Sequence, residues 1–164
     1  NTLTGLRVIS ALAGTATIVV NFVTFNDTDA APPVVQYGLS ASSLNMTALG
    51  VTHKYFTPAQ TREYFMHFVE LNLQEDTEYF YRVRSGNSAC VWSNVTSFRT
   101  LSSAKPPTMA MFGDMGIFEW NALSNLKDDV DNGRIQLLLH GECRCCFALF
   151  VINEFAHQWA RPIH

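Results

Sequence analysis

Charged residues are scarce in this sequence of 164 residues, and they form no long runs. Lys, Arg, Asp and Glu together make up 15% of the chain, and the formal net charge is only −3. There is no basic patch that could follow a phosphate backbone and no acidic tail, so we expect no nucleic-acid partner. Long apolar runs are also missing, because no stretch approaches the roughly 20 residues that a membrane-spanning helix needs. These absences exclude nucleic-acid-binding and membrane-spanning proteins from the expected classes.

Cysteine is sparse and unevenly placed. Cys90 is isolated, whereas Cys143, Cys145 and Cys146 crowd together. Three thiols without a matching Cys or His pair at zinc-finger spacing fall short of a tetrahedral site, and no disulfide framework can be deduced from them. We interpret the cluster as incidental or disordered, with a soft-metal site as the alternative. Cys90, which precedes Val91-Trp92, is interpreted as a small hydrophobic residue near a turn.

Apolar and β-branched side chains are abundant. Hydrophobic residues make up 48% of the chain and include twelve phenylalanines, enough to bury a core. The segment 17–25 places Ile18, Val20 and Phe22 on one face at a period of two, which predicts a half-buried strand. Six further strands are predicted at 6–12, 34–39, 51–56, 64–73, 77–84 and 91–100. Seven short strands separated by turns predict an antiparallel β-sandwich over residues 1–101.

Three aromatic side chains receive structural interpretations. Tyr79 falls near the start of the penultimate strand, six residues after Leu73, where its hydroxyl can bond to the upstream backbone as a tyrosine corner. The alternative is that Tyr79 is simply one alternating aromatic residue of a strand. His67 is interpreted as a strand histidine at the sandwich surface or domain boundary, and Trp120 as a packing residue.

The pattern changes after residue 101. Pro106 and Pro107 stop both helices and sheet ladders, so 102–108 is predicted to be a linker. Three elements then predict one βαβ unit: a strand at 109–112, an amphipathic helix at 120–132 capped by Gly133, and a strand at 135–139. One such unit cannot cover both faces of its own sheet, so we expect an incomplete α/β domain.

A carboxylate stands where α/β sheets place their ligands. Asp114 lies in the turn Gly113-Asp114-Met115-Gly116, directly after the first parallel strand. Together with Pro33-Val-Val-Gln-Tyr-Gly-Leu-Ser40 and Thr77-Glu-Tyr-Phe-Tyr-Arg-Val83, this motif resembles the purple acid phosphatases. The resemblance runs from about residue 6 to residue 140.

The resemblance implies a fibronectin-III-like sandwich, a linker, and the start of a calcineurin-like metallophosphoesterase domain at 109–142. It also implies hydrolysis of phosphate monoesters at acidic pH by iron and a second metal ion, which is zinc, iron or manganese. The family's ligands are the Asp of Gly-Asp-x-Gly, an Asp and a Tyr of Gly-Asp-x-x-Tyr, one Asn and three His. Asp114 matches the first of these. Phe22, where the family commonly has Trp, keeps an aromatic residue in the core.

The residues after His140 depart from the family. The family continues with Val-Gly-Asp-Phe-Ala-Tyr, whereas this chain continues with Gly-Glu-Cys-Arg-Cys-Cys-Phe. Glu142 could stand in for the metal-bridging Asp, but no Tyr follows at the required spacing. Two further histidines lie in no family block: His157 and His164. We interpret 143–164 as an atypical tail that follows a truncation or a change of reading frame, splice junction or gene model, and we expect this chain alone to be inactive. A non-catalytic secreted β-sandwich that binds a partner is the alternative function.

Three sequons bear on localisation. They begin at Asn26, Asn45 and Asn94 and are candidate sites of N-linked glycosylation. The apolar segment 11–20 lacks a basic start and a small-residue cleavage site, so we expect the chain to begin downstream of any signal peptide. With the family resemblance, the sequons predict a secreted or lysosomal protein that acts on phosphate monoesters and has no membrane partner.

Overall fold

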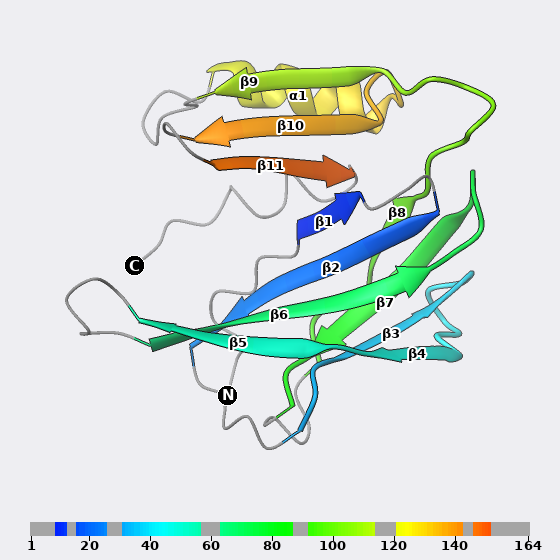
Figure 1. Ribbon diagram of the computed structural model, residues 1–164. Helices are drawn as coiled ribbons and strands as arrows, with labels where there is room; N and C mark the ends of the chain where they lie inside the picture. Colours follow the sequence, from blue (N-terminus) through cyan, green and yellow to red (C-terminus); the bar gives the residue numbers. More distant parts are fainter. Residues whose placement is uncertain are drawn as a thin grey trace.

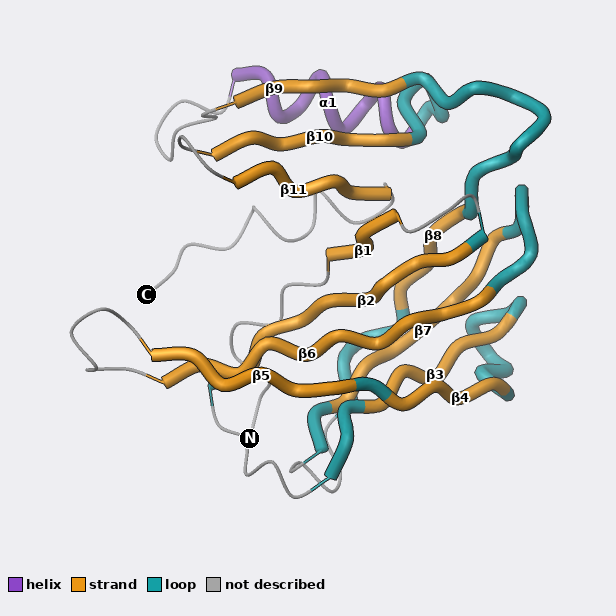
Figure 2. Tube along the Cα trace, in the orientation of Figure 1, coloured by secondary structure: helices purple, strands orange, loops and turns teal. Residues whose placement is uncertain are grey.

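The computed structural model describes residues 9–12, 16–25, 31–56, 63–86, 92–113, 121–142 and 146–151 (Figure 1). These ranges contain the strands β1 (Ile9–Leu12), β2 (Thr17–Thr24), β3 (Val34–Gly38), β4 (Met46–Leu49), β5 (Val51–Phe56), β6 (Glu63–Asn72), β7 (Glu78–Arg84), β8 (Thr96–Arg99), β9 (Met109–Gly113), β10 (Leu137–Glu142) and β11 (Cys146–Val151), and the helix α1 (Asn121–Asp131). Strands dominate the described part of the chain, as Figure 2 shows.

Two four-stranded antiparallel sheets form a sandwich. Their strand orders are β1-β2-β6-β5 and β4-β3-β7-β8, and the sheets face each other in Figure 1. The predicted mainly-β sandwich is therefore confirmed, with one strand more than the seven expected. The additional strand is β4, which lies in one sheet, while β5 begins two residues later in the other. Gly50 lies at this crossing, where a Cβ atom would come within 2.0 Å of the Phe68 carbonyl oxygen.

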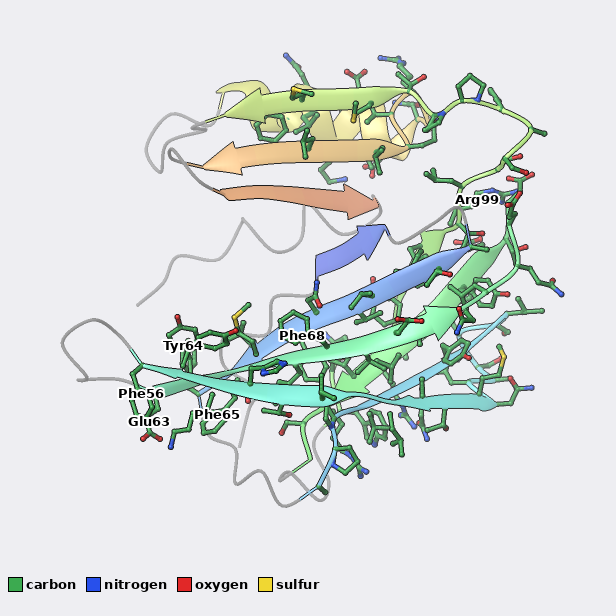
Figure 3. All side chains as sticks on the ribbon, in the orientation of Figure 1. Phe56, Glu63, Tyr64, Phe65, Phe68 and Arg99 are labelled. Atoms are coloured by element: carbon green, nitrogen blue, oxygen red, sulfur yellow. The ribbon has the colours of Figure 1, made fainter. Side chains whose placement is uncertain are left out.

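The core lies between the two sheets. Along β2 the buried residues alternate with half-buried ones, so Ile18, Val20 and Phe22 share the inner face as predicted. They belong to one apolar cluster with inward-facing residues of both sheets: Val35, Val69, Leu71, Tyr79, Tyr81, Val83 and Phe98. On β6, Phe65 points to one side of the sheet, and Tyr64 and Phe68 to the other (Figure 3). The period of two thus decides which side chains fill the core.

A buried tyrosine fixes the turn between β6 and β7. The side chain of Tyr79 is 4% exposed, and its hydroxyl oxygen accepts a hydrogen bond from the backbone N–H of Gln74 at 3.1 Å. This contact has the geometry expected of a tyrosine corner. Asp76, in the same turn, has a positive φ of 49°.

The second part of the chain forms a three-stranded sheet with the order β11-β10-β9. Strands β9 and β10 are parallel and are connected through α1, which is the predicted βαβ unit. Gly133 ends the helix with a φ of 66°. Its N–H bonds to the Val130 carbonyl and that of Arg134 to the Asp129 carbonyl, the pattern of a Schellman cap. Strand β11 pairs antiparallel with β10, so the segment expected to be an atypical tail adds a strand to this sheet.

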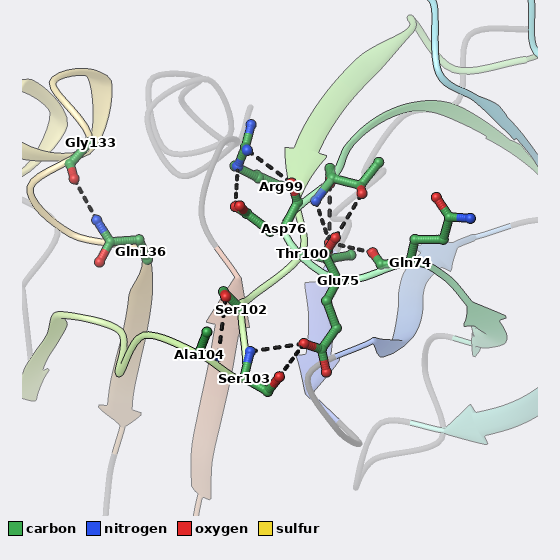
Figure 4. Close-up of polar contacts among 11 residues, drawn as sticks. Gln74, Glu75, Asp76, Arg99, Thr100, Ser102, Ser103, Ala104, Gly133 and Gln136 are labelled. Carbon is green, nitrogen blue, oxygen red and sulfur yellow. Dashed lines mark hydrogen bonds and ion pairs between the residues drawn. The ribbon is translucent and has the colours of Figure 1, made fainter.

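The predicted linker is anchored at both ends (Figure 4). Leu101 is buried in the sandwich core, and the backbone N–H and hydroxyl of Ser103 both donate to the carboxylate of Glu75. At the other end, the Thr108 N–H donates to the side-chain oxygen of Gln136 at 2.9 Å. Leu137, at the start of β10, joins the same core cluster as the sandwich residues. The sandwich and the α/β unit therefore share a packed boundary.

Within the described residues, no helix is long and apolar enough to cross a bilayer.

Candidate functional site

The two candidate carboxylates follow neighbouring strands. In the parallel ladder, β9 and β10 pair from Leu137 beside Met109 to Gly141 beside Gly113. Gly113 precedes Asp114 in the sequence, and Gly141 precedes Glu142. Asp114 itself lies outside the described residues, whereas Glu142 is the last residue of β10. The register therefore aligns the residues that precede the two carboxylates at the carboxyl edge of the sheet, where α/β folds bind ligands.

The register of these strands is set at their opposite ends. The side chain of Gln136 accepts from the Thr108 N–H and donates to the Gly133 carbonyl, which ties the start of β9 to the end of the helix. Leu138, the second residue of β10, is fully buried. Because both strands start at fixed points, Gly113 and Gly141 reach the carboxyl edge together.

The described residues do not assemble a metal centre around this edge. Among them, no group of three or more His, Cys, Asp or Glu side chains is placed to hold an ion. Two acidic side chains of α1 form ion pairs instead: Asp129 with Arg134 at 2.6 Å, and Asp131 with Lys127. The carboxylates of Asp129 and Asp131 are thus engaged in ion pairs at the surface of the helix and its C-terminal turn.

His67 lies in the core rather than at the surface. Its ring is fully buried on β6, with Nε2 2.8 Å from the Thr24 hydroxyl and Nδ1 2.8 Å from the Thr52 hydroxyl. Its ring also packs on Phe22, with the two centroids 4.5 Å apart. The expected surface position is therefore wrong. The period of two that places Phe65 inward also places His67 inward, and hydroxyls of the two neighbouring strands satisfy the ring nitrogens.

Several singled-out residues fall outside the described ranges: Asn26, Cys90, Trp120, Cys143, Cys145, His157 and His164. The other two sequons are described, and both Asn45 and Asn94 are exposed. Cys146 is the first residue of β11 and lies opposite Glu142 in the antiparallel ladder.

One cluster was missed by sequence reasoning. On the outer face of the second sheet, the Trp92 ring contacts the guanidinium groups of Arg82 and Arg84, at 4.5 and 4.8 Å from the ring centroid. Arg82 also donates twice to the side-chain oxygen of Gln36, on the neighbouring strand. Arginines two positions apart on one strand, followed by a tryptophan in the next segment, are the signal that could have revealed it. These contacts stabilise the packing of residues 92–95 on the sheet.

The comparisons with known proteins decide the family. The family described as purple acid phosphatase, N-terminal domain, matches residues 6–100, which is more than half of the chain. This chain belongs to the purple acid phosphatase family. The match covers the sandwich, and β9 begins nine residues beyond its end.

Two known phosphatases show how much of a longer protein the chain covers. An acid phosphatase of Aspergillus ficuum is 33% identical over an alignment of 96 residues, and the match covers 51% of this chain and 16% of that protein. The structure of a purple acid phosphatase from yellow lupin (Lupinus luteus) seeds superposes with a TM-score of 0.60 at 19% identity, over 76% of this chain and 27% of that one. The lupin match supports the fold, and the chain spans less than a third of either relative.

Proposed function

We propose that this chain is the N-terminal sandwich and the first βαβ unit of a phosphatase that hydrolyses phosphate monoesters at acidic pH. The observation that carries the proposal is the order of parts. A purple acid phosphatase sandwich over residues 6–100 is followed by a parallel βαβ unit whose first strand ends at Gly113, directly before Asp114. In this proposal Asp114 is the first iron ligand of the family's centre, and Glu142 stands in for the bridging acid.

The ligand count limits what this chain does by itself. The resemblance implies iron and a second ion, zinc, iron or manganese, held by seven side chains, of which only Asp114 has a matching position here. Even with Glu142 as the stand-in for the bridging acid, two carboxylates are too few donors for two ions. The residues present therefore do not fit the binuclear centre, and we propose that the 164-residue chain alone has no phosphatase activity.

The proposed location is extracytoplasmic, secreted or lysosomal. The exposed sequons at Asn45 and Asn94 support this location, because N-linked glycans are added to exposed sites of proteins in the secretory pathway.

The proposal is tested by turnover and colour. Incubated with iron and zinc at mildly acidic pH, the purified chain should stay colourless and should release no more p-nitrophenol from p-nitrophenyl phosphate than its Asp114→Ala variant. Asp128→Ala, which removes an exposed carboxylate of α1, is the matched control. Metal-dependent turnover that Asp114→Ala abolishes and Asp128→Ala leaves intact would contradict the inactive-chain proposal.

A second arm separates the enzyme from the binding module. In a chain where Val-Gly-Asp-Phe-Ala-Tyr and the rest of the family's catalytic domain follow His140, colour and activity should appear, and Asp114→Ala should remove both. A folded but inactive and colourless product would favour the non-catalytic sandwich. That alternative is supported by the closed core of the sandwich, which is formed almost entirely by its own strands.

A further inference from the structure

The second sheet of the sandwich has two edge strands of four residues each. In the order β4-β3-β7-β8, β4 pairs with β3 and β8 pairs with β7, and within the described residues neither has a partner on its other side. An edge strand presents unpaired N–H and C=O groups that can pair with a strand of another chain. Proteins manage such edges with charges, prolines, bulges or covering groups. Neither Met46–Leu49 nor Thr96–Arg99 contains a proline, and their one charged residue is Arg99.

Each edge strand is preceded by a sequon. Asn45 directly precedes β4, and its sequon ends at Thr47, the exposed second residue of that strand. Asn94 lies two residues before β8, and its sequon ends at Thr96, the first residue of that strand. Both asparagines are exposed. The two acceptor sites therefore lie at opposite edges of one sheet, each at the amino end of its edge strand.

The edge strand β5 of the other sheet has no sequon, and several of its apolar side chains are exposed. Val51, Tyr55 and Phe56 are 57%, 41% and 52% exposed. An ion pair between Lys54 and Glu63 joins this strand to β6 at 2.9 Å. The second sheet also exposes an apolar side chain at its edge, because Leu49 of β4 is 63% exposed. What distinguishes β4 and β8 from β5 is therefore the sequon that precedes each of them.

We propose that Asn45 and Asn94 carry N-linked glycans that shield the two edges of the second sheet from strand addition by another chain. In this modification the side-chain amide nitrogen forms a bond to the anomeric carbon of a lipid-linked oligosaccharide. The bond between the sugar and its pyrophosphate breaks, the lipid pyrophosphate leaves, and the amide loses one proton to the transferase. A glycan is bulky and hydrophilic, so at these positions it covers the amino end of each edge strand. The inference is independent of phosphatase activity.

Site occupancy is tested in the full chain secreted from a eukaryotic cell. Thr47→Ala and Thr96→Ala each destroy one sequon and keep its asparagine, so each variant should lose one glycan, and the double variant should lose both. Peptide N-glycosidase converts a glycosylated Asn to Asp, which identifies the occupied sites by peptide mass spectrometry. Val95→Ala changes the exposed middle residue of a sequon and should keep the glycan. Secreted chain with unmodified Asn45 and Asn94 would overturn the proposal.

Shielding is tested separately by association. At equal concentration, the double variant and the enzymatically deglycosylated wild type should both scatter more light on incubation than the glycosylated protein. Val95→Ala should behave like the glycosylated protein. Equal scattering by all four samples would overturn the shielding role even if both sites are occupied.

Discussion

The sandwich and the α/β unit bury their apolar side chains to very different extents. The inner faces of the sandwich meet each other, and residues such as Val20, Val35 and Val69 are fully buried. The sheet of the α/β unit has α1 along one face (Figure 1), while Met109 and Met111 of β9 remain 47% and 64% exposed. The sandwich therefore encloses its own apolar core, whereas the described α/β unit still presents apolar surface that a covering layer would bury.

The boundary between these regions has its own physical basis. Leu101 and Leu137 pack in the sandwich cluster, and the Glu75 carboxylate holds the backbone of Ser103. The α/β unit therefore begins from a fixed position beside the sandwich. Leu137 lies at the start of β10, whereas the candidate carboxylates lie at or just after the opposite ends of β9 and β10.

The largest expected effect comes from a truncation in the sandwich core. Phe22 is 1% exposed and packs on His67, so Phe22→Ala should lower the free energy of unfolding by about 3–5 kcal/mol. The matched truncation in the α/β unit, Met111→Ala, removes an exposed side chain and should change it by less than about 0.5 kcal/mol. Urea unfolding followed by far-ultraviolet circular dichroism measures both. Similar losses in the two variants would show that the two regions are packed alike.

An intermediate effect is expected at the tyrosine corner. Tyr79→Phe keeps the buried ring but leaves the Gln74 N–H without its acceptor, so the free energy of unfolding should fall by about 1–3 kcal/mol. Tyr55→Phe is the control, because that tyrosine is 41% exposed on β5 and its hydroxyl should matter little. The same urea titration measures the free energy of unfolding of both variants. A loss at Tyr79 no larger than that at Tyr55 would mean that the corner contact contributes nothing to stability.

Local periodicity predicted those parts of the fold that neighbouring residues determine. The alternation around Val20 and the glycine at position 133 specified β2 and the end of α1, because both depend on only a few residues. Strand β4 was not recognised, since its inward residues are Met46 and Ala48, a weak apolar signal that only pairing with β3 turns into a strand. The prediction for His67 was wrong because its burial depends on hydrogen bonds to hydroxyls of two other strands, which the local sequence does not show.

The candidate site was predictable to a similar extent. The position of Asp114 after a parallel strand follows from a local motif, strand then Gly-Asp-x-Gly. That Gly141 pairs with Gly113 follows only from the register of two strands joined through a helix. The Arg82–Gln36 contact likewise joins residues that only the pairing of β3 with β7 brings together. Long-range pairing is the step that sequence periodicity does not specify.

The smallest expected effect on stability tests the open face of the α/β sheet. Met109→Gln combined with Met111→Gln keeps the side-chain length but makes the exposed face polar, so the chain should bind less of a dye that fluoresces on apolar surfaces. The free energy of unfolding should change by less than about 0.5 kcal/mol, because both side chains are exposed. Val51→Thr on the sandwich edge, where Val51 is 57% exposed, is the matched control and should leave dye binding nearly unchanged. If the control variant lowers dye fluorescence and the double variant does not, the main apolar surface belongs to the edge of the sandwich. The contrast between a closed sandwich and an open α/β unit would then be reversed.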